Sequence, residues 1–130
     1  GGGGRGEEHV GRTLAELGRQ KIADNTIVIV LSDNGRPFPY CKTMVHVPGV
    51  RTPFIVRWPA KVKASGESGS VISTLDLAPT ILDLAGVNVG TTFQGQSLRP
   101  ILLDPTAEVR AYAFAEHNWH DYRAFERGVH

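Results

Sequence analysis

Several features that mark particular classes of protein are scarce or missing in this sequence of 130 residues. Its single cysteine, Cys41, excludes an internal disulfide, so cysteine usage does not indicate whether the protein occupies an oxidising or a reducing compartment. No apolar run reaches the roughly 20 residues that a membrane span needs. Lys and Arg number 14 against 13 Asp and Glu, a net charge of +1. That balance offers no support for a nucleic acid or an anionic membrane as partner.

What is present is the composition of an ordinary globular protein, with 41% apolar and 21% charged residues. Glycine is common, at 15 residues, and five of these lie within the first six positions. We therefore expect residues 1–6 to be a linker or the edge of a fragment. Residues 7–130 are expected to form part of one domain.

Hydrophobic periodicity and turn residues predict an α/β fold. The predicted elements are a helix over 7–21, strands over 26–31 and 54–58, a helix over 76–85, a helical turn over 98–103 and a strand over 111–115. Residues 36–49 are predicted to be loop, and 116–130 a polar aromatic tail. In the helix over 76–85, Asp76 is predicted to be the N-terminal cap, Pro79 fits the first turn, and Gly86 is expected just after the end. The run 26–31 is apolar on both faces, which is typical of a covered strand in a mostly parallel sheet. Three strands are few for such a sheet, which indicates that part of it is missing.

The first candidate site follows that apolar strand, at Asp33 and Asn34. Ligands of parallel sheets bind beyond the carboxyl ends of the strands. Carboxylate and amide oxygens suit calcium or magnesium better than zinc. The alternative is an ordinary turn, because Asp-Asn-Gly is good turn sequence. Two oxygen ligands are fewer than the roughly six to eight that calcium takes, so a metal here needs further ligands.

Lys42 is the second candidate, nine residues after Asp33. A lysine beside a metal could bind an anionic substrate as a point charge. The alternative is a solvated surface lysine. Its neighbour Cys41 has no defined histidine partner and is expected to be a plain thiol.

The third candidate is the segment 116–123, which carries His117 and His120. A histidine there could donate a proton or hydrogen-bond a substrate near neutral pH. The alternative is an exposed polar tail. His9 and His46 are expected to be structural or to face solvent.

Four segments together resemble sulfatases of the alkaline-phosphatase superfamily, in that family's order and spacing. They are DNTIVIVLSDNG at 24–35, GVRTPFIVRWP at 49–59, DLAPTILDLAG at 76–86 and GQSL at 95–98. Within the family, NGRPFP at 34–39 with the short gap to Lys42, and FAEHNWHD at 114–121, look like the heparan N-sulfatase (sulfamidase) branch. The resemblance implies the carboxyl-side part of a three-layer α/β sandwich whose amino-terminal half is absent.

The resemblance also implies roles for individual residues. Asp33 and Asn34 would be ligands of Ca²⁺, and Lys42 would contact the sulfate group and the nucleophile. One of His117 and His120, more so His120, would line the substrate pocket. The family nucleophile is a formylglycine made from Cys or Ser, with Pro two and Arg four residues later. Cys41 does not match that motif, and no serine here has Pro two residues later.

The function implied is calcium-assisted hydrolysis of sulfate esters or sulfamates, with N-sulfoglucosamine-type glycans favoured and the nucleophile outside this chain. We expect the 130 residues alone to be inactive. One alternative is a phosphomonoester or phosphodiester hydrolase of the same superfamily. Another is a non-catalytic module that binds sulfated glycans. The resemblance suggests an exported, periplasmic, extracellular or lysosomal protein.

Overall fold

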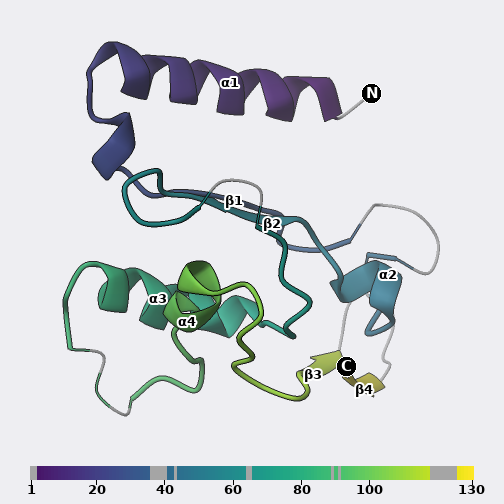
Figure 1. Ribbon diagram of the computed structural model, residues 1–130. Helices are drawn as coiled ribbons and strands as arrows, with labels where there is room; N and C mark the ends of the chain where they lie inside the picture. Colours follow the sequence, from purple (N-terminus) through teal and green to yellow (C-terminus); the bar gives the residue numbers. More distant parts are fainter. Residues whose placement is uncertain are drawn as a thin grey trace.

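A computed structural model describes residues 3–35, 41–42, 44–63, 66–88, 90, 92–117 and 126–130. The α-helices are α1 (Gly3–Arg19), α2 (Val47–Val50), α3 (Leu77–Leu84) and α4 (Arg99–Leu103), with 3-10 turns η1 (Ala23–Asn25) and η2 (Thr74–Asp76). The strands are β1 (Val28–Leu31), β2 (Phe54–Arg57), β3 (Phe114–His117) and β4 (Glu126–Val129). In Figure 1, α1 lies on one side of β1 and β2, while α3 and α4 lie on the other. The predicted α/β class and its layers are confirmed.

The described strands form two antiparallel pairs, β1 with β2 and β3 with β4. This corrects the prediction of a mostly parallel sheet for the strands that the structure describes. The prediction rested on a run that is apolar on both faces, which indicates that the strand is buried on both sides. A buried strand can pair in either direction, so the pattern does not determine the direction. β1 pairs Val28 with Arg57 and Leu31 with Phe54, so its carboxyl end lies at the start of β2.

Helix α1 begins at Gly3, four residues before the predicted start at Glu7. Glycine disfavours helix, which is why the sequence predicted the later start. The helix ends in a Schellman arrangement: Ile22 N donates to Leu17 O at 3.1 Å, and Lys21 N donates to Gly18 O at 3.0 Å. Lys21 takes the left-handed position, with φ of 59°, where glycine is the usual residue. No helix within the described ranges combines the length and the apolar character that crossing a bilayer requires.

Asp76 is the centre of a buried polar network and is fully shielded from solvent. Its carboxylate accepts hydrogen bonds from Ser73 N at 2.7 Å and Gln96 N at 2.8 Å, and forms an ion pair with Arg110. This corrects the prediction that Asp76 caps α3, because its side chain makes no cap hydrogen bond there. Ser73 and Asp76 instead form a capping box on η2. Gly86, with φ of 76°, follows α3 as predicted.

A second buried link joins α3 to the segment before α4. Thr80 Oγ1 donates to Asp76 O at 2.5 Å and accepts from Leu98 N at 2.9 Å. Gly95 lies so close to Leu75 that a Cβ on it would be 2.0 Å from Leu75 O. The segments 76–86 and 95–98, which carry two of the four recognised motifs, are therefore joined by buried hydrogen bonds and backbone contact.

Among the described α-helices and strands, α2 and β4 were not predicted, and β3 is displaced. β3 begins at Phe114, three residues later than the strand predicted over 111–115. β4 lies inside the predicted polar tail. It was not predicted because its sequence, ERGV, has little strand propensity and forms a strand only through its pairing with β3. α2 lies inside the predicted loop, where Pro48 is tolerated in the first turn of a helix.

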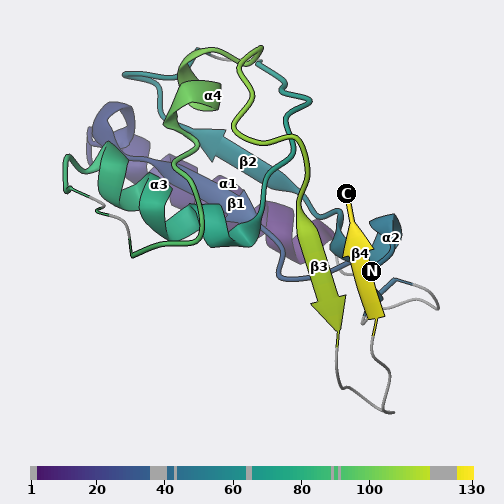
Figure 2. The ribbon, with the colours of Figure 1, turned by 90° about the horizontal axis from the view of Figure 1, so that it is seen from below.

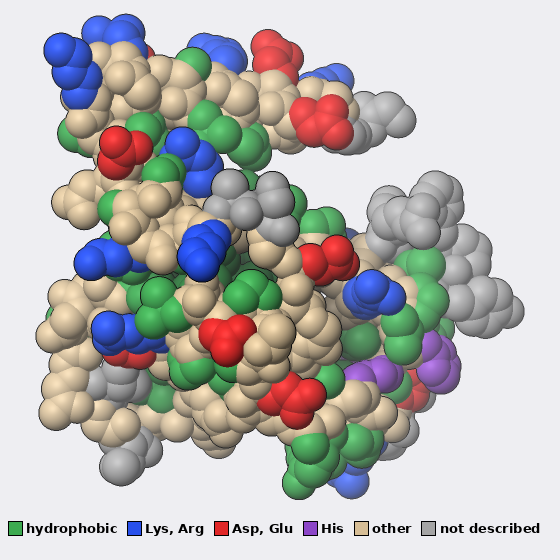
Figure 3. All heavy atoms as spheres, viewed as in Figure 1, with side chains coloured by type: hydrophobic (Ala, Val, Ile, Leu, Met, Phe, Trp, Pro, Cys, Tyr) green, Lys and Arg blue, Asp and Glu red, His purple; other side chains and the backbone are tan. Residues whose placement is uncertain are grey.

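The apolar core of the described residues is small. Among the described residues, Val45 and Leu98 are buried, with 7% and 2% exposure, and Pro79 is also buried. Many large apolar side chains are exposed, among them Ile55 at 59%, Phe114 at 74% and Val129 at 64%. Figure 3 shows such apolar side chains reaching the surface around the sheet and helices. Buried polar links therefore account for much of what connects the segments.

Acid is expected to weaken the contact between α3 and the segment before α4. The Ser97 hydroxyl donates to Asp83 at 2.5 Å, and with Arg99 it holds the pKa of Asp83 below its ordinary value of 3.8. A carboxyl whose pKa is lower in the folded state contributes stability above its unfolded pKa and loses it as the pH falls through the folded pKa. The unsubstituted chain should therefore exceed Asp83→Asn in stability at pH 6, and the difference should shrink below about pH 4. Urea unfolding of both proteins at pH 6 and pH 3 measures this, and an equal difference at both values would contradict it.

Candidate functional site

The carboxyl end of β1 meets α2 at a point where two backbones touch. Gly35 N donates to Gly49 O at 2.8 Å. A Cβ on Gly35 would lie 2.1 Å from Pro48 O, and one on Gly49 would lie 2.2 Å from both Cys41 O and Met44 O. Only glycine permits approaches of this kind. The turn after β1 and the segment that carries Lys42 therefore both contact α2, at Gly49.

Asp33 and Asn34 lie in the turn directly before this contact. Asn34 N donates to Asp33 Oδ1 at 3.0 Å, and Asn34 Nδ2 donates to Gly35 O at 2.7 Å. Ser32 Oγ donates to Asn34 O at 3.0 Å. The turn predicted as the alternative is therefore present. This turn also orients the amide group of Asn34, because its Nδ2 is hydrogen-bonded to the backbone oxygen of Gly35. No described residue donates a hydrogen bond to the side-chain oxygen of Asn34.

These two side chains fit part of a hard-cation site. Asp33 is exposed and Asn34 is half-buried. In the part of the chain that the structure describes, no group of three or more His, Cys, Asp or Glu side chains could hold a metal ion. The donor chemistry suits calcium or magnesium, and the number of donors falls short of a whole coordination sphere.

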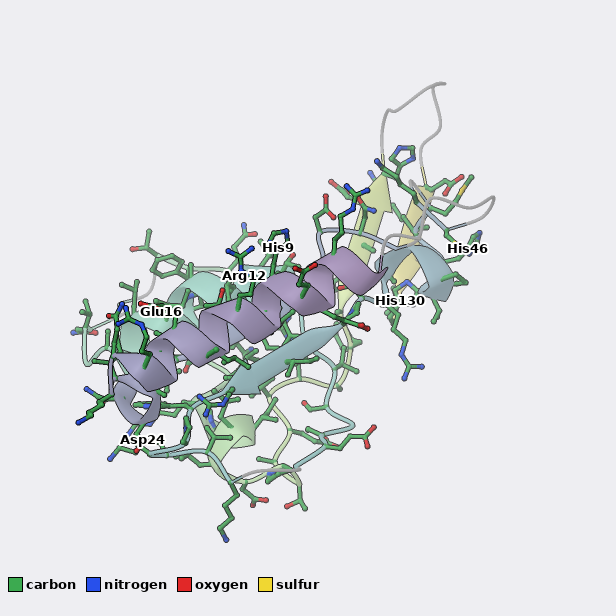
Figure 4. All side chains as sticks on the ribbon, turned by 90° about the horizontal axis from the view of Figure 1, so that it is seen from above. His9, Arg12, Glu16, Asp24, His46 and His130 are labelled. Carbon is green, nitrogen blue, oxygen red and sulfur yellow. The ribbon has the colours of Figure 1, made fainter. Side chains whose placement is uncertain are left out.

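The β3–β4 hairpin packs against the segment between Lys42 and α2. His130 Nε2 lies 2.6 Å from Val45 O, and a Cβ on Gly128 would lie 3.1 Å from the same oxygen. Figures 1 and 2 both show the hairpin beside α2. In Figure 4, His46 and His130 lie at this end of the molecule, and Asp24 lies at the other. The hairpin and the Gly35–Gly49 contact therefore approach one segment, residues 44–49.

The predicted residues are placed as follows. Lys42 is exposed, next to half-buried Cys41. His117 is half-buried, on the same face of β3 as Ala115. His120 lies outside the described residues. His9 and His46 are exposed, as expected.

Sequence reasoning missed two residues near this point, Glu126 and His130. Both lie in the region predicted to be a tail. The register of β4 reveals Glu126 by pairing it with His117, and backbone hydrogen bonds to Ala113 place His130. No sequence motif indicates either pairing.

A methyl group at the glycine contact should disrupt this arrangement. In Gly35→Ala the new Cβ would meet Pro48 O, a backbone atom that cannot turn aside. We expect a loss of about 1–3 kcal/mol in the free energy of unfolding, as for other overpacked sites. Gly69→Ala is the control, because nothing lies within 4 Å of a Cβ at that exposed position. Equal urea midpoints for the two variants would show that the close approach is unimportant.

Solved structures similar to this one define its class. The structure of BT4656 in complex with its substrate D-glucosamine-2-N,6-O-disulfate superposes with a TM-score of 0.85 at 30% identity, over 95% of this chain and 27% of that chain. The phosphonate monoester hydrolase SpPMH from Silicibacter pomeroyi gives 0.73 at 30% identity, over 85% of this chain and 23% of that one. The fold is therefore the carboxyl-side part of an alkaline-phosphatase-like sulfatase fold.

Sequence comparison narrows the class to a family. The family described as "N-sulphoglucosamine sulphohydrolase, C-terminal" matches residues 38–129, and the chain belongs to this family of sulfuric ester hydrolases. The human N-sulphoglucosamine sulphohydrolase is 43% identical over 81 residues, which are 62% of this chain and 16% of that protein. An N-acetylglucosamine-6-O-sulfatase of Bacteroides thetaiotaomicron is 37% identical over 100 residues, 74% of this chain and 18% of that protein. The chain thus spans less than a fifth of either relative.

Proposed function

We propose that residues 7–130 are the carboxyl-side part of the catalytic domain of a sulfatase that hydrolyses sulfate esters or sulfamates, with N-sulfoglucosamine-type glycans favoured. The observation that carries the proposal is the Gly35–Gly49 contact, which brings the turn of Asp33 and Asn34 toward the segment of Lys42. The family match over residues 38–129 supports the reaction class.

Asp33 and Asn34 would hold Ca²⁺ together with ligands from elsewhere in the protein. The turn supports this role because it carries both residues and holds Asn34 through Nδ2, so that no described residue donates to its side-chain oxygen. When bound, such a cation supplies charge neutralisation at sulfate oxygens. Asn34 is anchored through Nδ2 to Gly35 O, so its oxygen needs little rearrangement on binding.

Lys42 would contact the anionic group of the substrate. Its ammonium is a compact cation on a flexible stem, and it is exposed beside the glycine contact. Charge that develops on the sulfate oxygens in the transition state would be stabilised by a cation placed there beforehand.

His117 would line the sugar pocket, and His120 is proposed for the same role. The less exposed face of β3 supports the role of His117, because Gly128, which is paired with Ala115 on that face, lies against Val45. An imidazole can hydrogen-bond a sugar hydroxyl or supply a proton to the leaving group near neutral pH.

The nucleophile is proposed to lie outside residues 1–130, because no Cys or Ser here has the family's Pro and Arg at the required spacing. The exposed apolar side chains of β2, β3 and β4 support packing against further polypeptide of the same protein. The 130 residues alone are accordingly expected to release no sulfate.

The test is an assay of the protein produced from the whole reading frame that encodes this segment. We expect it to release sulfate from D-glucosamine-2-N,6-O-disulfate in the presence of calcium. The likeness to a phosphonate monoester hydrolase favours one second candidate, phosphoryl ester hydrolysis, so a phosphonate monoester is assayed in parallel. Faster hydrolysis of the phosphonate would favour the second candidate, and turnover of neither would overturn both.

A further inference from the structure

The β3–β4 hairpin presents a carboxylate beside His117 that the proposed function does not use. Exposure alternates along both strands, and the less exposed positions are Ala115 and His117 on β3 and Glu126 and Gly128 on β4. The register pairs His117 with Glu126 and Ala115 with Gly128. Side chains opposite each other in such a pair lie on one face of the sheet. Glu126 therefore shares the face of His117.

The contacts of Gly128, which lies on the same face as Glu126, show what this face is turned toward. A Cβ on Gly128 would lie 3.1 Å from Val45 O and 3.5 Å from Val45 Cβ. Val45 belongs to the segment that also contacts Gly35 through Gly49. The face that carries Glu126 is therefore turned toward the segment on which the candidate site is built. Figure 3 shows histidine side chains gathered on this side of the molecule, over α2 and the hairpin.

Glu126 has an oxygen whose hydrogen bond is not supplied by the described part of the chain. Its Oε2 is buried and accepts no hydrogen bond from any described residue. A buried acceptor without a donor costs free energy, more so when it belongs to a charged group. Native proteins keep few such atoms, and those that remain call for an explanation. A bound molecule with an O–H or N–H group would supply the missing donor.

We propose that Glu126 is a specificity-determining residue, whose carboxylate accepts a hydrogen bond from a ring hydroxyl of the sulfated amino sugar. This inference rests on the proposed function. The charge pattern gives the sugar a direction: Lys42 and a cation at Asp33 attract the sulfate, whereas Glu126 repels it and prefers an uncharged hydroxyl. The sugar would therefore place its sulfate beside β1 and an uncharged hydroxyl edge against the hairpin.

The same hairpin offers a matched control. Glu116 lies on the outer face, with its side chain 63% exposed, and pairs with Arg127 at 3.7 Å. Glu116→Gln and Glu126→Gln make the same chemical change on adjacent strands of one hairpin. A general effect of charge or of hairpin stability would appear in both variants, and only a contact on the inner face would appear in Glu126→Gln alone.

The experiment measures kcat and KM of the whole reading-frame product with D-glucosamine-2-N,6-O-disulfate and with its 3-deoxy and 4-deoxy analogues. We expect Glu126→Ala to raise KM by about 10-fold or more, as for loss of a hydrogen bond to a charged group, with kcat changed less than KM. Glu116→Ala, the matched change on the outer face, should leave both constants unchanged, and Glu116→Gln is compared with Glu126→Gln in the same way. One deoxy analogue should lose the same factor with the unsubstituted protein and lose nothing further with Glu126→Ala.

Unchanged KM in Glu126→Ala, or equal losses for each analogue with and without Glu126, would overturn the inference while sulfate release persists. Absence of sulfate release by the unsubstituted protein would instead overturn the proposed function, and the inference with it. If Glu126→Ala does not fold, KM is measured for the isosteric Glu126→Gln with the same substrate and deoxy analogues. A smaller loss for one deoxy analogue with Glu126→Gln than with the unsubstituted protein would support the inference, and equal losses would overturn it.

Discussion

Replacing Asp33 by Ala in the whole reading-frame product is expected to lower kcat/KM for sulfate release by about 10³-fold. The reason is that the variant loses a carboxylate proposed to hold the cation. A bound metal supplies several kcal/mol of transition-state stabilisation, and each ~1.4 kcal/mol is a factor of ten in rate. Stability should change little, because Asp33 is exposed and its carboxylate bonds only to the adjacent Asn34 N among the described residues. Steady-state kinetics across a calcium titration measures the effect.

Asp24→Ala is the control for this prediction. Asp24 is also an exposed carboxylate next to β1, and it lies at the other end of that strand (Figure 4). Its substitution should leave the calcium dependence and the rate unchanged. Similar activity in the two variants would mean that Asp33 does not hold the cation.

Replacing Asp76 by Ala is expected to destabilise the folded chain by about 3–5 kcal/mol, the range for removing one partner of a buried ion pair. The variant leaves Arg110, whose side chain is only 15% exposed, without its counter-ion. It also removes the acceptor for Ser73 N and Gln96 N. Urea unfolding followed by circular dichroism measures the loss, which is a large share of the roughly 5–15 kcal/mol typical of a domain.

Asp83→Ala is the matched control on α3. Its carboxylate also accepts from one hydroxyl and pairs with an arginine, but the side chain is 29% exposed and Arg99 is 54% exposed. Partly exposed pairs contribute about 0–1 kcal/mol. If both variants lost the same stability, the burial of Asp76 would not be what makes its network important.

The sequence predicted the parts of the fold that depend on local patterns. The apolar run 26–31 became β1, and Pro79 and Gly86 stand at the start and end of the predicted second helix. The four motifs identified the family. Asp33 and Asn34 were nominated from their place after the apolar run, and Lys42 from its short distance in sequence to Asp33. Their roles stay predictions.

The parts that were not predicted depend on contacts between distant segments. β4 is a strand because β3 pairs with it, and its own residues carry no such signal. Glu126 entered the argument only through that register. The role of Asp76 depends on Gln96 and Arg110, which lie 20 and 34 residues away in sequence. Sequence alone indicated a helix cap at that position, because a cap needs only local residues.

A crystal structure of the whole reading-frame product with calcium and D-glucosamine-2-N,6-O-disulfate would show whether Asp33, Asn34 and Lys42 form one site. We expect one cation bound by oxygens of Asp33 and Asn34 at about 2.3–2.6 Å, with a sulfate group between that cation and Lys42. A cation or sulfate bound away from these three side chains, with Asp33 and Lys42 in solvent, would contradict this expectation.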